Sequence, residues 1–207
     1  MEQNKKEIRN IPLEVRIKEG SRLVEGYALL FDTPSDGLPF TERINPSALD
    51  GVIERSNIFA LLNHDSSRGI LARSKNGKGT LELEVDDLGL MYSFESPKTA
   101  IGDELLEYIK RGEINESSFA FTVGEDEWKK DGENWVRTIK SFDKLYDISP
   151  VYDAAYSSTS VYTRGMDEAK KKLEEEQLRV EIEKQLEEEK RQRAENYDRL
   201  INMLNNY

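Results

Sequence analysis

The chain contains a single histidine, His64, which lies where a buried apolar run ends abruptly in Asn63-His64-Asp65. An imidazole with an ordinary pKa of about 6.5 accepts and returns protons near neutral pH. His64 is therefore the one imidazole in the chain that can act as a general base at a catalytic site. The structural alternative is a polar residue that simply ends a strand.

A serine hydroxyl is a weak nucleophile that such a base would activate. Side chains alternate between the two faces of a strand. In ESSFAFTV, residues 116–123, the phenylalanines share the core face with Ser117, and the other face carries Ser118, Ala120 and Thr122. These small neighbours leave room for a molecule to approach the Ser118 hydroxyl, although most serines on strands are only surface or turn residues.

A third group normally orients the imidazole and stabilises its charged form. In KLYDIS, Asp147 lies on the opposite strand face from Tyr146 and Ile148, which makes it available for this role. Asp65 and Asp143 are alternatives. Spacing along the chain does not choose among these carboxylates.

Composition argues against several other kinds of site. The chain has no cysteine, which rules out disulfides, thiol catalysis and thiolate metal sites, and fits a reducing, cytoplasmic setting. The formal net charge of −11 disfavours direct contact with nucleic acid. No apolar stretch approaches the ~20 residues that span a bilayer, and the N-terminus has no signal-peptide core. We expect no cofactor and no zinc; a carboxylate-bound magnesium ion is the open alternative.

The body of the chain, residues 10–163, is rich in short strands. The clearest helix is predicted over residues 99–113, ending near Gly112, and another begins after Asn45. Strands are predicted over residues 13–18, 57–65, 69–74, 80–87, 90–96 and 116–123, and a strand pair or one strand bent at Gly26 over 22–31. A hairpin with its turn at 131–134 is predicted over 127–142, and residues 144–164 close the body. Many strands with few helices predict a mainly β fold, an antiparallel barrel or sandwich with peripheral helices.

Composition changes near Gly165, which predicts two domains, residues 1–164 and residues 165–207. The second lacks proline, is dominated by helix-favouring residues, and reads as a long charged helix. A narrow, interrupted apolar stripe along it favours a weak coiled coil or docking on a partner, and a merely solvated helix is the alternative. The stripe consists of Met166, Ala169, Leu173, Leu178, Ile182, Leu186, Tyr197, Leu200, Ile201 and Leu204.

Several segments between residues 20 and 163 resemble, in order, the prohead maturation proteases of HK97-type tailed bacteriophages. They are VEGYALLFDTPS, ERINPSALD, LLNHDSSRGILARS, VDDLGLMYSFE, LLEYIKRGEINESSFAF and LYDISPVYDAAYSST. The chain departs from the family's pattern at Ser47, Leu49, Glu116, Ala120, Asp147 and Ala154. Glu116 and Ala120 replace the two glycines that flank the family's serine.

The resemblance implies a serine endopeptidase with the herpesvirus assemblin-like fold, a closed seven-stranded β-barrel surrounded by helices. By matching position, His64 is the general base and Ser118 the nucleophile. Asp147 is the expected third member, because a carboxylate accepts the imidazole N–H where related viral proteases often use a second histidine. Arg68 or Arg73 is a candidate for holding a water or backbone group near the oxyanion.

The resemblance also implies partners and a place of action. We expect contact with the major capsid protein and with helices of the scaffold or delta domain, inside the procapsid in the host cytoplasm. A homodimer is possible, without direct contact to nucleic acid or membrane. Cleavage of the scaffold, of the delta domain and of the chain itself near 162–165 is expected. An inactive, protease-like assembly protein is the main alternative, and a magnesium-dependent enzyme is a third hypothesis.

Overall fold

The structure, a computed structural model, describes residues 6–11, 15–34, 38–152 and 159–205; in the last range it describes side chains only at 167 and 169–193. Contacts divide the chain into two compact units, Met1–Val161 and Tyr162–Tyr207. Ala154, one of the positions that depart from the family's pattern, lies outside the described residues.

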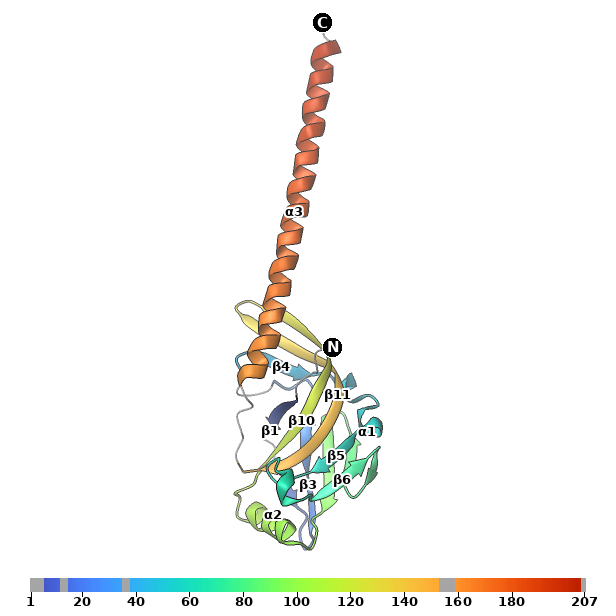
Figure 1. The fold of residues 1–207 in the computed structure, drawn as a ribbon, viewed down its shortest axis with the longest axis vertical. Helices are drawn as coiled ribbons and strands as arrows, with labels where there is room; N and C mark the ends of the chain where they lie inside the picture. Colours follow the sequence, from blue (N-terminus) through green and yellow to red (C-terminus); the bar gives the residue numbers. More distant parts are fainter. Residues whose placement is uncertain (1–5, 12–14, 35–37, 153–158, 206–207) are drawn as a thin grey trace. The chain divides into compact units, whose positions relative to one another are not determined.

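The strands of the first unit form two sheets (Figure 1). One has the order β1-β10-β11-β5-β6-β7, with β4 also pairing with β11, and the other has the order β2-β3-β9-β8. The strands are β1 Glu7–Ile11, β2 Arg16–Ile17, β3 Leu23–Leu30, β4 Thr41–Ile44, β5 Asn57–Ala60, β6 Ala72–Lys75, β7 Lys78–Gly79, β8 Glu82–Val85, β9 Gly89–Glu95, β10 Glu116–Asp131 and β11 Asn134–Val151. The prediction of a mainly β fold with helices is confirmed.

The closed barrel that the resemblance implied is not found in the described ranges, where no strand pairing joins the two sheets. Alternation of side chains identifies a strand and its buried face, but it carries no information about which edges pair. The barrel therefore rested on the resemblance alone, and the structure corrects it to two sheets.

Helices and short 3-10 turns connect the strands. The predicted helix over 99–113 is α2, Ala100–Lys110, and Gly112 follows its end with a φ of 71°. The helix expected after Asn45 is divided into a 3-10 turn η1, Pro46–Leu49, and a short α1, Val52–Arg55. Gly51 separates them with a φ of 65°, a left-handed conformation that ends the first turn.

Two long strands dominate the larger sheet. The hairpin predicted over 127–142, with its turn at 131–134, is confirmed, and its first strand is continuous with the strand predicted over 116–123, so that β10 has 16 residues and β11 has 18. The pairing shifts register on both sides of Gly124, where an added Cβ would lie 2.7 Å from Ser141 Oγ. The hairpin brings Ser118 and Asp147 into one sheet. β1 pairs with the edge of β10 that faces away from β11 (Figure 1).

The hydrophobic core contains side chains of both sheets. The rings of Phe119 and Phe121 on β10 stack with a centroid distance of 5.2 Å, and Phe121 stacks on Phe142 of β11 at 4.5 Å. The Tyr92 hydroxyl, from the other sheet, lies 2.9 Å from the Ser117 hydroxyl. Burial raises the pKa of Tyr92, so its hydroxyl stays protonated. Ser117 thus faces the core, as predicted.

The described part of the second unit belongs to one helix, α3, Thr159–Asn205, which begins six residues before the predicted boundary at residue 165. Four apolar side chains on it are exposed, at Leu178, Val180, Ile182 and Leu186. The side chains of the predicted stripe at Met166 and from Tyr197 onward lie outside the described ones. None of the helices in the described ranges has both the length and the apolar character that crossing a membrane requires.

Candidate active site

Three neighbouring strands of the larger sheet position the predicted residues. Ser118 is on β10 and lies opposite Ser149 of β11, and Asp147 on β11 lies opposite Ala120. On the other side of β11, the parallel strand β5 places Phe59 beside Asp147. The chain leaves β5 at residue 60 and reaches His64 four residues later. The sheet order thus brings together on β5, β11 and β10 residues that are separated by tens of positions in the sequence.

A tight reversal directs His64 toward this sheet. Asn63 and His64 both have left-handed backbone conformations, with φ values of 54° and 59°. Such conformations are uncommon for residues other than glycine and are held by their surroundings. Here the Asn63 N–H donates to the Pro150 carbonyl at 3.0 Å, and the Asp65 N–H donates to the Leu62 carbonyl at 3.1 Å. These bonds fix the turn to the end of β11.

The three predicted side chains meet. His64 Nε2 lies 2.6 Å from Ser118 Oγ, and His64 Nδ1 is hydrogen-bonded to Asp147 Oδ1. The His64 side chain is 13% exposed and that of Asp147 is 3% exposed. This is the arrangement of a nucleophile, a base and an orienting carboxylate.

Two further residues hold the carboxylate. Ser149 Oγ donates to Asp147 Oδ1 at 3.0 Å and lies 3.2 Å from His64 Nδ1. Lys6 Nζ lies 2.9 Å from Asp147 Oδ2. Burial raises the pKa of Asp147, but the hydrogen bonds and charges of His64 and Lys6 lower it by more, so that it lies below its ordinary value. The carboxylate is therefore ionised at neutral pH.

The sequence analysis missed both of these residues. Ser149 follows Asp147 by two positions on the same strand, so alternation along KLYDIS could have placed it on the same face. Lys6 immediately precedes β1, a strand that was not predicted. Nothing in the sequence near Lys6 indicated a distant carboxylate.

The two alternative carboxylates have other partners. Asp65 accepts the Ser67 N–H at 2.9 Å and so caps η2, Ser66–Arg68. Asp143 Oδ2 accepts a long hydrogen bond of 3.4 Å from Thr122 Oγ1. Of the three aspartates, Asp147 is thus the one that is hydrogen-bonded to His64.

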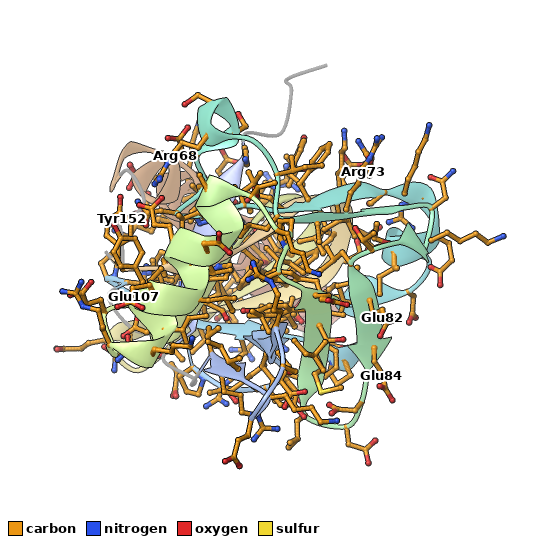
Figure 2. The ribbon with its side chains drawn as sticks, turned by 90° about the horizontal axis from the view of Figure 1, so that it is seen from below. Arg68, Arg73, Glu82, Glu84, Glu107 and Tyr152 are labelled. Atoms are coloured by element: carbon orange, nitrogen blue, oxygen red, sulfur yellow. The ribbon has the colours of Figure 1, made fainter. Side chains whose placement is uncertain are left out.

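The two candidate arginines also point to other partners. Arg68 forms an ion pair with Glu104, and Arg73 Nε donates to Asn57 Oδ1 at 2.6 Å. Figure 2 shows Arg68 beside α2 and Arg73 well away from it, by β6. A role for either in binding an oxyanion stays a prediction.

A pocket of about 450 Å³ lies beside α2. It is lined by Arg68, Tyr108, Glu113 and Tyr152, and Arg68 and Tyr152 lie on the same side of α2 in Figure 2. The Tyr108 and Tyr152 rings meet edge to face with centroids 6.3 Å apart. Tyr152 directly follows Val151, which pairs with Glu116, two residues from Ser118. The pocket is thus within a few residues of the hydroxyl along both strands.

The described part of the chain contains no group of three or more histidine, cysteine, aspartate or glutamate side chains placed to hold a metal ion.

Comparison with known families gives the class of this site. Residues 11–172 match the caudovirus prohead serine protease family. The chain belongs to this family. The assignment agrees with the resemblance inferred from the sequence motifs. It establishes that this prohead protease is of the serine class.

Two other comparisons add little to the assignment of this prohead protease. One solved structure that it resembles is that of the bacteriophage T4 capsid assembly protease, gp21, with 13% sequence identity and a TM-score of 0.49. That match covers 72% of this chain and 98% of the T4 chain. No curated protein matches the sequence.

Proposed function

We propose that this chain is an active endopeptidase in which Ser118 is the nucleophile, His64 the general base and Asp147 the residue that orients His64. The observation that carries this proposal is the 2.6 Å separation of His64 Nε2 from Ser118 Oγ, with Nδ1 of the same ring held by Asp147. The family assignment supplies the reaction class, peptide-bond hydrolysis by a serine.

In the first half of the reaction, Ser118 Oγ attacks the carbonyl carbon of the scissile peptide bond. His64 Nε2 takes the hydroxyl proton, and Asp147 stabilises the imidazolium through the Nδ1–H. When the tetrahedral intermediate collapses, the C–N bond breaks and His64 gives its proton to the departing amine. The product is an ester between Ser118 and the acyl part of the substrate.

In the second half, a water molecule replaces the amine. His64 removes a proton from the water as it attacks the ester carbonyl, then returns that proton to Ser118 Oγ as the C–O bond breaks. The acid product leaves and the enzyme regains its starting protonation state.

Within head maturation, we assign catalysis to residues 1–164 and partner contact to residues 165–207. The expected substrates are the scaffold and the delta domain of the major capsid protein, cleaved inside the procapsid in the host cytoplasm. The exposed Leu178, Ile182 and Leu186 of α3 lie four residues apart, which suits contact with a helical partner or a second copy of the chain.

Self-cleavage near residues 162–165 is a further expected reaction. This segment lies within α3. A peptide that pairs with a strand has to be extended, so the beginning of α3 has to unwind before the site can cleave it.

Co-expression with the capsid protein tests the proposal. The wild type should shorten the capsid protein, whereas Ser118→Ala and His64→Ala should leave it intact. Shortening that persists in both variants would rule out the assigned roles. The tail is followed by intact-mass measurement of the wild type and Ser118→Ala. Identical tails in both, under conditions where the wild type cleaves capsid protein, would rule out self-removal.

An inactive, protease-like assembly protein is the second candidate, and two observations favour it. Ser118 is wholly buried, and Glu116 and Ala120 stand where the family has glycines. An inactive protein predicts an intact capsid protein in the wild type as well. The same co-expression therefore separates the two candidates.

A further inference from the structure

The Ser118 hydroxyl is closed off from solvent. Ser118 is 0% exposed, so the carbonyl of a substrate cannot reach Oγ in this conformation. Backbone pairing surrounds this part of β10 on both edges, with β11 on one side and β1 on the other. Because β11 carries Asp147 and is paired with β5, it belongs to the site itself. β1 is the element that can leave without dismantling the triad.

β1 makes its contact at the nucleophile. Asn10 lies opposite Ser118 in the antiparallel pairing, and Ser118 Oγ donates a hydrogen bond to the Arg9 carbonyl at 2.9 Å. Just before the strand, Lys6 reaches Asp147. The segment thus touches both the nucleophile and the carboxylate of the site.

The bond to Arg9 competes with catalysis for one proton. A hydroxyl has a single O–H to donate. When that proton is given to the Arg9 carbonyl, it is not given to His64 Nε2, which has to receive it for Ser118 to attack. The strand therefore both covers the hydroxyl and directs its proton away from the base.

Ion pairs hold β1 on the sheet, and they determine which charges stay buried when β1 separates from β10. Arg9 Nη2 lies 2.7 Å from Glu42 Oε2 and 2.6 Å from Glu7 Oε2, and Arg137 Nη1 lies 2.8 Å from Glu7 Oε2. Glu42 and Arg137 also contact each other directly at 3.0 Å. β1 thus brings one acid and one base, and it leaves one paired acid and base behind. Its release leaves Arg137 paired with Glu42, and the buried charge that loses a partner is Asp147, through Lys6.

We infer that β1 is an internal blocking strand, which occupies the edge of β10 where an extended substrate peptide has to pair. Peptides commonly bind by adding a strand to an exposed sheet edge. On β10 near Ser118, that edge is the one now held by residues 7–11. This inference rests on the proposed function, because it identifies the pairing edge with the substrate site of the same serine.

Alkylation of a cysteine at position 118 measures the opening independently of catalysis. The chain contains no cysteine, so Ser118→Cys introduces a single thiol for iodoacetamide. We expect slow alkylation of Ser118→Cys and a rate about tenfold higher when Arg9→Ala is added, as loss of a charge-assisted hydrogen bond predicts. Arg16→Ala is the matched control, because Arg16 pairs with Glu25 on the surface, and it should leave the rate unchanged.

Ser117→Cys distinguishes opening of β1 from general unfolding. Ser117 is the adjacent residue, equally buried, but it faces Tyr92 in the core. Arg9→Ala should leave its alkylation slow. Equal acceleration at 117 and 118 would overturn the inference, as would rates at 118 that stay unchanged both in Arg9→Ala and in the strand-breaking variant Ile8→Pro.

Cleavage of capsid protein supplies the second readout. With Ser118 intact, Arg9→Ala should cleave about tenfold faster than wild type, in step with the alkylation rates. A wild type that cleaves as fast as Arg9→Ala would overturn the blocking role while leaving the protease intact. Suppose that Arg9→Ala accelerates alkylation at position 118 but neither wild type nor Arg9→Ala cleaves capsid protein. That result would support β1 as a blocking strand and reject the proposed function.

Discussion

Lys6 Nζ lies 2.9 Å from Asp147 Oδ2, although the two residues are 141 positions apart in the sequence. The other oxygen of the same carboxylate holds His64 and accepts from Ser149. Asp147 is therefore shared between the proposed catalytic base and the segment that covers the nucleophile. The contacts of this carboxylate lead to the first two predictions.

Asp147→Asn should lower kcat by about 10⁴-fold, because an amide cannot hold the imidazole in the tautomer that accepts the Ser118 proton. Asp143→Asn is the matched control, since this exposed aspartate is hydrogen-bonded to Thr122, and it should retain activity. The measurement is kcat on a peptide spanning the capsid cleavage site. Equal losses in the two variants would reject the assignment of Asp147.

Ser149→Ala should reduce kcat about fivefold and leave KM nearly unchanged. Ser149 orients the carboxylate without touching the reacting atoms, and one buried hydrogen bond is worth about 1 kcal/mol. The same change made in Asp147→Asn should have a smaller effect, because the two residues act through one network. A full fivefold loss in both backgrounds would show that Ser149 acts independently of Asp147.

Tyr152→Ala should raise KM about fivefold with little effect on kcat, because an aromatic contact in the pocket beside α2 is worth about 1 kcal/mol. Leu88→Ala is a suitable control, since Leu88 is also a large exposed apolar residue, 62% exposed on the β8–β9 connection. Steady-state kinetics on the same peptide separate the two parameters. An unchanged KM would remove the pocket from the substrate site.

Glu7→Gln should reduce the acid sensitivity of the fold. Burial raises the pKa of Glu7, but the hydrogen bonds and charges of Arg137 and Arg9 lower it below its ordinary value of 4.5. Such a carboxylate stabilises the fold above its unfolded pKa, and the contribution is lost as the pH falls through the lower folded pKa. We expect Glu7→Gln to be less stable by about 2 kcal/mol near neutral pH.

Urea unfolding at a series of pH values from neutral to below 4.5 tests this expectation. The difference between wild type and Glu7→Gln should shrink as the pH falls, because protonated Glu7 no longer attracts the two arginines. Glu133→Gln, in the exposed turn between β10 and β11, provides the comparison. A difference that stays constant over the whole range would show that Glu7 does not act through its charge.

Leu178→Lys combined with Ile182→Lys should weaken contact between α3 and a helical scaffold while leaving hydrolysis of a short peptide unchanged. The change places two charges on the apolar stripe. Gln177→Lys combined with Gln192→Lys adds the same charge outside the stripe. Co-sedimentation with scaffold is the measurement. Equal binding by the two double variants would show that the stripe is not the contact.

Much of the site was predictable from local sequence. Alternation in ESSFAFTV distinguished Ser118 from Ser117, and alternation in KLYDIS placed Asp147 on its own face. The abrupt end of an apolar run at His64 marked a turn beyond a buried strand. These features depend on neighbours within a few residues, which is the range over which strand periodicity is informative. His64, Ser118 and Asp147 lie close together only because of the order of the strands in the sheet. That order was not predictable from their spacing in the sequence.

The covering strand was missed for a physical reason. In EIRNI, the buried side chains are Glu7 and Arg9, which a hydrophobic pattern assigns to solvent. They are buried because Glu42 and Arg137, far along the chain, supply opposite charges. The prediction of open space beside the Ser118 hydroxyl was wrong, because the unpredicted strand β1 occupies that space. The break predicted between the strand over 116–123 and the hairpin over 127–142 was wrong because Gly124 and the charged residues after it resemble a turn.

The left-handed pair Asn63 and His64 bears on how the imidazole is aimed. The main-chain hydrogen bonds to Pro150 and Leu62 fix the point from which the His64 side chain leaves the turn, and Asp147 orients the ring from there. The ring is consequently preorganised when the chain folds, and little reorientation is left for the chemical step. Loss of Asp147 should change which ring nitrogen carries the proton far more than the position of the turn, so a crystal of Asp147→Asn should still show the left-handed pair in place.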